Sequence, residues 1–133
     1  MTHALAALQT ALVAALETHP VLMAELSGIY DGPPPGASFP YVAIGDALVT
    51  DWSTKTGAGR EIRLPLTLWD DGDNAARMTD LMAHVEDAIA ALPRQIPDWH
   101  LASVTFLRSM LVRDAAGPWA GLVEHRIRML AVA

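Results

Sequence analysis

The sequence predicts an α+β domain in which helices pack on one face of a four-stranded, mainly antiparallel sheet. Leucines recur at helical spacing near the start of the chain, and apolar and polar residues alternate strictly over residues 61–69. The last third of the chain alternates again on both sides of a turn. These patterns predict the order α-α-β-β-α-β-β within one domain that spans residues 1–133.

Two helices are expected at the start. Residues 4–17 form the first, because many alanines raise helix propensity and leucines occur at steps of three and four, at Leu5, Leu8, Leu12 and Leu16. A short second helix is expected over residues 20–27, with Thr18 as its cap, Pro20 in its first turn and Gly28 at its C-terminal cap. Residues 31–36, which hold three prolines and two glycines, cannot continue a helix or a ladder and predict a stiff loop.

The next two elements are expected to be strands. Residues 41–45 form the first, which leads through residues 47–52 into a polar turn at residues 53–59. Residues 61–69 form the second, with one apolar face made by Ile62, Leu64, Leu66 and Leu68. Pro65 lacks a backbone donor, so this strand is expected at a sheet edge or beside a bulge.

A third helix and a hairpin complete the expected fold. Asp70, Asp71 and Asp73 suit a solvated helix N-terminus, with Asp73 as the cap. The buried stripe of this helix consists of Met78, Met82, Val85, Ile89 and Leu92. The hairpin pairs residues 99–112 with residues 122–132 around a turn at residues 114–119. Its last strand places Val123, His125, Ile127 and Met129 on one face and Glu124, Arg126 and Arg128 on the other.

The charge is acidic and unevenly distributed. Nine Lys and Arg residues against fifteen Asp and Glu residues give a net charge of −6. Residues 1–54 hold five of the acids and no Lys or Arg, which argues against a protein that wraps tightly around nucleic acid. The final forty residues instead carry more bases than acids. A chain that is acidic at one end and basic at the other can pair head-to-tail with copies of itself.

The hydropathy indicates apolar surface beyond what one core needs. Hydrophobic residues make up 52% of the chain and the mean hydropathy is +0.26, so the excess is expected at a subunit interface. The uncharged segment at residues 1–16 is too short to span a membrane and lacks the basic start of a signal peptide. The chain has no cysteine, which excludes disulfides and fits synthesis in the cytoplasm.

The motifs predict no catalytic, cofactor or metal site. The five histidines lack metal-ligand spacing, and His125 is predicted to be a core or interface histidine on the apolar face of the last strand. No phosphate-binding loop and no nucleophile elbow is present in the sequence. The aspartates at residues 70–73 lack the glutamate that completes a calcium loop of the EF-hand type.

Two sets of side chains leave alternatives open. The tryptophans lie at strand ends or turns, where they either border the core or anchor a protein interface: Trp52, Trp69, Trp99 and Trp119. Four arginines of the hairpin form a basic patch, which is either a solvated sheet face or a surface that pairs with an acidic neighbouring subunit: Arg108, Arg113, Arg126 and Arg128.

Two blocks of sequence carry a resemblance to a known family. The block YDGPPPGASFPYV at residues 30–42, followed by DWSTKTG at residues 51–57, resembles the tail completion or tail terminator proteins of tailed phages, prophages and gene transfer agents. The resemblance extends through residues 64–69 and the acidic turn to the C-terminal hairpin. It implies a structural virion protein with no enzymatic activity and no cofactor.

The resemblance also implies partners. It implies a hexameric ring that caps the head-proximal end of the tail tube, stops tube polymerisation and contacts the head-completion (stopper) protein. Contacts to other subunits or to the tube are expected from residues of the loop 51–60, the strand ends and the hairpin: Asp51, Trp52, Lys55, Arg60, Trp69, Arg113, Trp119, Arg126 and Arg128. In a ring, DNA passes through the lumen without specific binding, and the hypothesis is that an acidic lining at Glu17, Glu25 and Asp31 prevents it from sticking.

Two other functions remain open at this stage. A head-tail connector or adaptor subunit of the same particle shares these surfaces without terminating the tube. A small α+β hydrolase or ligand-binding domain instead requires a concave pocket with a perturbed titratable group, for which His125 is the candidate. Native mass spectrometry separates a hexamer from a monomer. The expected location is the cytoplasm during assembly and then the head-tail junction of the particle, with no membrane involved.

Overall fold

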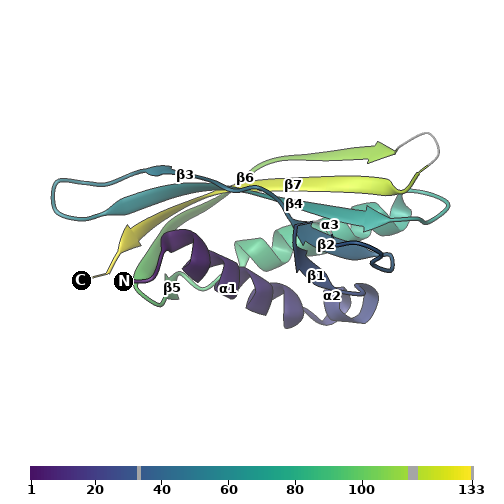
Figure 1. Ribbon diagram of the computed structural model, residues 1–133, viewed down its shortest axis with the longest axis horizontal. Helices are drawn as coiled ribbons and strands as arrows, with labels where there is room; N and C mark the ends of the chain where they lie inside the picture. The colour runs from purple at the N-terminus through teal and green to yellow at the C-terminus, as the bar shows by residue number, and fades with distance from the viewer. Residues whose placement is uncertain (33, 114–116, 133) are drawn as a thin grey trace.

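The computed structural model describes residues 1–32, 34–113 and 117–132, and it places all three helices on one face of a long twisted sheet (Figure 1). The helices are α1 (Ala4–Glu17), α2 (Pro20–Glu25) and α3 (Ala76–Ala90). The strands are β1 (Ile29–Asp31), β2 (Tyr41–Ile44), β3 (Leu48–Asp51), β4 (Gly59–Asp70), β5 (Gln95–Ile96), β6 (Trp99–Arg113) and β7 (Trp119–Ala131).

The sheet has seven strands in the described part of the chain, so the predicted α+β class is confirmed and the predicted number of four is wrong. The predicted order α-α-β-β-α-β-β is also wrong, because four strands rather than two lie between α2 and α3 and three follow α3. The order across the sheet is β1-β2-β4-β7-β6-β5, and β3 pairs with β4 beside β2. Only β1 and β2 run parallel. The strands that the sequence analysis did not count, β1, β3 and β5, have four residues or fewer, and so short a run carries no clear alternation.

The register of β4 and β7 explains where the core lies. Leu64 faces His125 and Leu66 faces Val123, so the apolar sides of both strands lie on the face that the helices cover. The helix α3 packs against β4, β6 and β7, and α1 packs beside α3. The predicted leucines of α1 and the predicted stripe of α3 are buried, apart from the half-buried Leu5.

Pro65 lies at an interruption of the ladder rather than at a sheet edge. β4 is an interior strand, with β7 on one side and with β2 and β3 on the other. The carbonyl of Pro65 accepts from the backbone N–H of Gly45 at 2.8 Å, at the junction where β2 ends and before β3 begins. The missing donor of Pro65 therefore falls where no strand needs it.

The ends of α2 differ from the prediction in two respects. Pro20 occupies the first turn as expected, but His19 caps the helix, because its Nδ1 accepts from Leu22 N at 3.4 Å. Thr18 instead donates to the carbonyl of Ala14 at the end of α1. The helix ends at Glu25, so Gly28 is not its C-terminal cap.

The start of α3 also differs, because Asp73 does not cap it. The side chain of Asn74 accepts from the backbone N–H of Ala76 at 2.9 Å. Asp70, predicted to be solvated, is fully buried and paired with Arg77. The predicted loop at residues 31–36 and turn at residues 114–119 fall partly outside the described residues, at residue 33 and at residues 114–116.

Candidate functional site

The described residues contain no group of three or more His, Asp or Glu side chains that could hold a metal ion. No helix in that part of the chain is long and apolar enough to cross a membrane.

His125 is 2% exposed and packs edge-on against the ring of Phe106, as expected for a core histidine. Burial lowers its pKa, and it lines neither the groove between α1 and β1 nor the groove between α1 and α3. The candidate site consists of surfaces that can contact other proteins.

The first surface is the arm, residues 52–58, which links β3 to β4 and projects beyond the rest of the molecule (Figure 1). Trp52 N donates to the carbonyl of Gly59 at 2.9 Å and Gly59 N donates to Ser53 Oγ at 3.0 Å, so two hydrogen bonds close the base of the arm. At the same base, Arg60 forms an ion pair with Asp51 at 3.2 Å. The Ser53 hydroxyl donates to Asp51 at 2.6 Å and is the main cause of the lowered pKa of that carboxyl.

The second surface is the helix-free face of the sheet, where four arginines surround two glutamates. Glu124 accepts from Arg63 and from Arg108, each at 3.1 Å. Glu61 accepts from Arg128 at 2.9 Å and lies 3.9 Å from Arg126. This charge ladder (Glu61, Arg63, Arg108, Glu124, Arg126 and Arg128) brings bases of β4, β6 and β7 onto acids of the same chain, and it lowers the pKa of Glu124 against the desolvation that would raise it.

The ladder changes the interpretation of the predicted basic patch. Its arginines were expected either to be solvated or to pair with a neighbouring subunit, whereas three of the four pair with acids of their own chain. The fourth, Arg113, lies apart from the ladder and stacks over the Trp119 ring at 4.9 Å. Arg128 also stands 5.4 Å from the centre of the Trp52 ring, which connects the ladder to the base of the arm.

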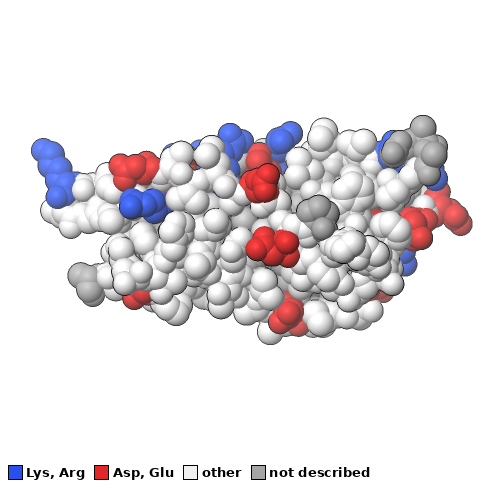
Figure 2. All heavy atoms as spheres, viewed as in Figure 1, with Lys and Arg blue, Asp and Glu red and all other residues white. Residues whose placement is uncertain are grey.

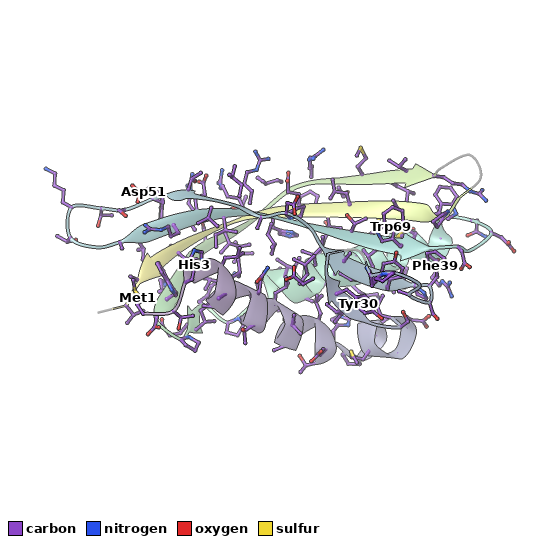
Figure 3. All side chains as sticks on the ribbon, viewed as in Figure 1. Met1, His3, Tyr30, Phe39, Asp51 and Trp69 are labelled. Atoms are coloured by element: carbon purple, nitrogen blue, oxygen red, sulfur yellow. The ribbon has the colours of Figure 1, made fainter. Side chains whose placement is uncertain are left out.

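A third surface lies at the opposite end of the sheet. Trp69 and Asp51 occupy opposite ends in Figure 3, and the register places Trp69 next to the strand that begins with Trp119. The Trp119 indole N–H donates to the carbonyl of Gly72 at 3.1 Å. Three of the four tryptophans are partly exposed, but Trp99 is buried and borders the core.

The three predicted lumen acids do not lie together. Glu17 and Asp31 line one groove of about 600 Å³ between α1 and β1. Glu25 lies on α2, where its charge acts on Arg77. The predicted residues therefore divide among the arm, the helix-free face, the far end of the sheet, this groove and α2.

Two features of the surface were not predicted from the sequence. Glu61 and Glu124 are the centres of the ladder, which alternation places on the correct face but which only the register of β4, β6 and β7 brings together. The second is the outer edge of β6, which has no strand partner after His100 in the described chain, because β5 pairs only with Trp99 and His100. Along this edge Phe106, Met110 and Val112 are each 47% exposed.

A projecting arm, a long sheet edge without a strand partner in the described chain and a groove are surfaces suited to contacts with other proteins, as in a structural subunit of an assembly. Comparison with known sequences identifies the family. The profile of the family described as tail completion protein gp17 matches residues 10–130, and the chain belongs to this family.

Individual relatives agree with this assignment. The chain is 29% identical to the tail completion protein gp17 of Bacillus phage SPP1 over 111 residues, which cover 84% of this chain and 82% of that protein. A chain in the structure of the virion of a native gene transfer agent particle superposes with a TM-score of 0.84 at 29% identity, over 98% of this chain and all of that one. The structure of bacteriophage SPP1 gp17 has the same fold, with a TM-score of 0.63 at 24% identity, over 96% of this chain and 89% of that one.

The family assignment settles the general function. The protein is a structural component of the tail of a phage virion or gene transfer agent particle, and its family is not one of enzymes. The reading as a small hydrolase is thereby excluded.

Proposed function

We propose that this protein is a tail terminator: a ring-forming subunit that caps the head-proximal end of the tail tube and stops its polymerisation. The ring then joins the tail to the head-completion protein. The hexamer is part of this proposal, and so is a lumen through which DNA passes without specific binding.

The free edge of β6 is the observation that carries this proposal. A strand edge of about a dozen residues with exposed Phe106, Met110 and Val112 is a surface that a monomer normally protects. The opposite side of the sheet ends in β1, so the two edges of the sheet are different surfaces. Contacts between two different surfaces of identical copies propagate in one direction and close into a ring where the rotation allows it.

The predicted contact residues enter the proposal by location. The arm and its base carry Asp51, Trp52, Lys55 and Arg60, and the far end of the sheet carries Trp69, Arg113 and Trp119. We assign both ends of the sheet to contacts with neighbouring subunits or with the tube. The charge ladder, which includes Arg126 and Arg128, holds the sheet face between the two ends rigid. Lumen roles for Glu17, Glu25 and Asp31 stay predictions, which neutralising substitutions and a measurement of DNA retention would test.

The decisive experiment removes the protein from its particle. Particles assembled without the chain should show overlong tubes that lack heads in electron micrographs, and restoring the wild-type chain should restore a single tube length. A connector predicts a different outcome, in which tubes of normal length accumulate without heads. Purified chain added to polymerising tube protein should likewise shorten the tubes in proportion to its concentration, and unchanged tube lengths would contradict termination.

A further inference from the structure

The groove between α1 and β1 has the features of a binding site for a segment that projects from another molecule. Its floor and walls include Val13, Ala14, Ile29 and Ile44, and its volume is about 600 Å³. Tyr30 of β1 lies below the sheet next to α1 in Figure 3 and also lines the groove. The carboxylates of Glu17 and Asp31 stand at this otherwise mostly apolar site, and both residues are exposed.

One wall of the groove is an unpaired strand edge. In a parallel pair, alternate residues direct both backbone groups toward the partner strand. The carbonyl of Gly28 accepts from Val42 N, and Gly32 N donates to the carbonyl of Ile44. The even-numbered residues of this segment therefore direct their backbone groups toward β2. Ile29 and Asp31 therefore direct their N–H and C=O groups outward, where the described chain provides no further strand. Backbone groups of an incoming segment can hydrogen-bond to them.

The arm supplies a segment of complementary charge. Lys55 is the only lysine of the chain, is exposed at the arm, and forms no ion pair with any described residue. Figure 2 shows a basic side chain at the tip of the arm and separate acidic side chains near the middle of the same view. Thr54 N donates to the carbonyl of Gly57 at 2.9 Å, so the tip is already ordered as a tight turn and loses little entropy on docking.

We propose that the arm of one copy docks in the α1–β1 groove of the next copy, with Lys55 against Glu17 and Asp31. The contact rests on the proposed ring and specifies how neighbouring subunits recognise one another. Arm and groove are different surfaces, so the contact is head-to-tail and leaves each copy one free arm and one free groove until the ring closes. An ammonium group on a flexible stem suits this site, because its apolar stem can cover Val13 and Ala14 while its charge reaches the carboxylates.

Cysteine pairing tests the contact directly, because the natural chain has no cysteine. In the double variant Lys55→Cys/Asp31→Cys, mild oxidation should link copies into a series of covalent oligomers. The largest oligomer should contain as many copies as the ring has subunits. The matched control is Lys55→Cys/Asp73→Cys, since Asp73 is equally exposed but lies beside α3. Both variants are oxidised as purified chain and within assembled tails. A lack of linked species in both samples, or equal linking in the control, would overturn the proposal.

Charge reversal supplies an independent test of the same contact. Lys55→Glu alone and Glu17→Lys/Asp31→Lys together should each weaken self-association by at least about tenfold, since like charges then meet at every contact. The triple variant that combines them should recover wild-type assembly, because each contact regains opposite charges. Asp73→Lys, a charge reversal at an exposed residue beside α3 and away from the groove, is the control and should leave self-association unchanged.

The outcomes separate this contact from the function on which it rests. Rings that form normally in all charge variants would overturn the arm contact and leave the terminator proposal standing. Rings that form normally while DNA retention changes would assign Glu17 and Asp31 to the lumen instead. Cross-linked rings that fail to limit tube length would support the contact and contradict the terminator function.

Discussion

Arg77 in the first turns of α3 binds both carboxylate oxygens of Asp70, the last residue of β4. Its Nε donates to Oδ2 at 2.9 Å and its Nη2 donates to Oδ1. Asp70 is fully buried and also accepts from the backbone N–H of Asp71 at 2.9 Å. The hydrogen bonds from Arg77 hold the pKa of Asp70 below its ordinary value against the desolvation that would raise it. This pair ties the end of β4 to the first turn of α3.

Asp70→Asn should lower the free energy of unfolding by about 2–3 kcal/mol, because it removes the charge from a buried pair and leaves Arg77 without its partner. The Arg77 side chain is 45% exposed, which keeps the loss below the range of about 3–5 kcal/mol for fully buried pairs. Chemical denaturation of wild type and Asp70→Asn at neutral pH measures this loss of unfolding free energy. Asp73→Asn, three residues further on and exposed, is the control and should change stability by less than about 0.5 kcal/mol.

The same pair predicts a pH dependence at the acid end. Because the folded pKa of Asp70 is lowered, its contribution is present above the unfolded pKa, about 3.9, and is lost as the pH falls through the folded value. The stability difference between wild type and Asp70→Asn should therefore narrow below about pH 4. A difference that stays constant from pH 6 to pH 3 would contradict the assigned role of the carboxylate.

His125 predicts a second pH dependence, near neutrality. Its Nδ1 has no hydrogen-bond partner in the described chain, and burial lowers its pKa. A histidine with a lowered folded pKa favours the folded state above the unfolded pKa of about 6.5, and that stability is lost as the pH falls below it. The wild type should lose stability between pH 7 and pH 5, and His125→Met should flatten this slope.

Gly59 should tolerate no side chain, because of the closed base of the arm. A Cβ at Gly59 would lie 2.2 Å from the backbone oxygen of Trp52, an atom that cannot move aside without breaking the base. Gly59→Ala should cost about 1–3 kcal/mol in unfolding free energy and should speed hydrogen exchange of the arm amides. Gly57→Ala meets only Thr54 Oγ1 at 3.9 Å and is the matched control. Equal stability of the two variants would contradict the packing at the base.

The long elements of this fold are predictable from sequence because the periodic pattern of their apolar and polar residues shows which face is buried. The alternation over residues 61–69 predicted the buried side of β4 correctly, and the same holds for Val123, Ile127 and Met129 of β7. The short strands were not predictable in this way. β1 has three residues and is held by backbone hydrogen bonds to β2, a strand ten residues further along the chain, so its own side chains carry no periodic signal.

The candidate site shows the same division between local and long-range information. The loop with Lys55 was predictable as a surface loop, since its composition is that of a polar turn. The groove was not, because Glu17 and Asp31 come together only when α1 packs beside β1. Asp70 was predicted to be solvated for a related reason: its partner Arg77 suits an exposed helix position equally well, and only the turn between β4 and α3 directs it back to the strand.

Glu61 gives the last prediction, because it holds the ladder and the base of the arm at once. Its carboxylate accepts from Arg128 at 2.9 Å and lies 3.9 Å from Arg126, and Arg128 in turn lies over the Trp52 ring. Glu61→Gln keeps the shape but leaves the arginines to repel one another, so stability should fall by about 1 kcal/mol at low salt.

Salt distinguishes this electrostatic account from a loss of packing. At 1 M salt the screening length is about 3 Å, so the difference between wild type and Glu61→Gln in urea unfolding should shrink by at least about half. Asp87→Asn, at an exposed α3 residue that forms no ion pair in the described chain, should show no such dependence. A difference that salt leaves untouched would mean that Glu61 stabilises the sheet by contact alone.

Because Arg128 links the charge ladder to Trp52, Glu61→Gln should also shift the fluorescence of Trp52 at the base of the arm. A charge ladder that acts only on the sheet would leave that emission unchanged.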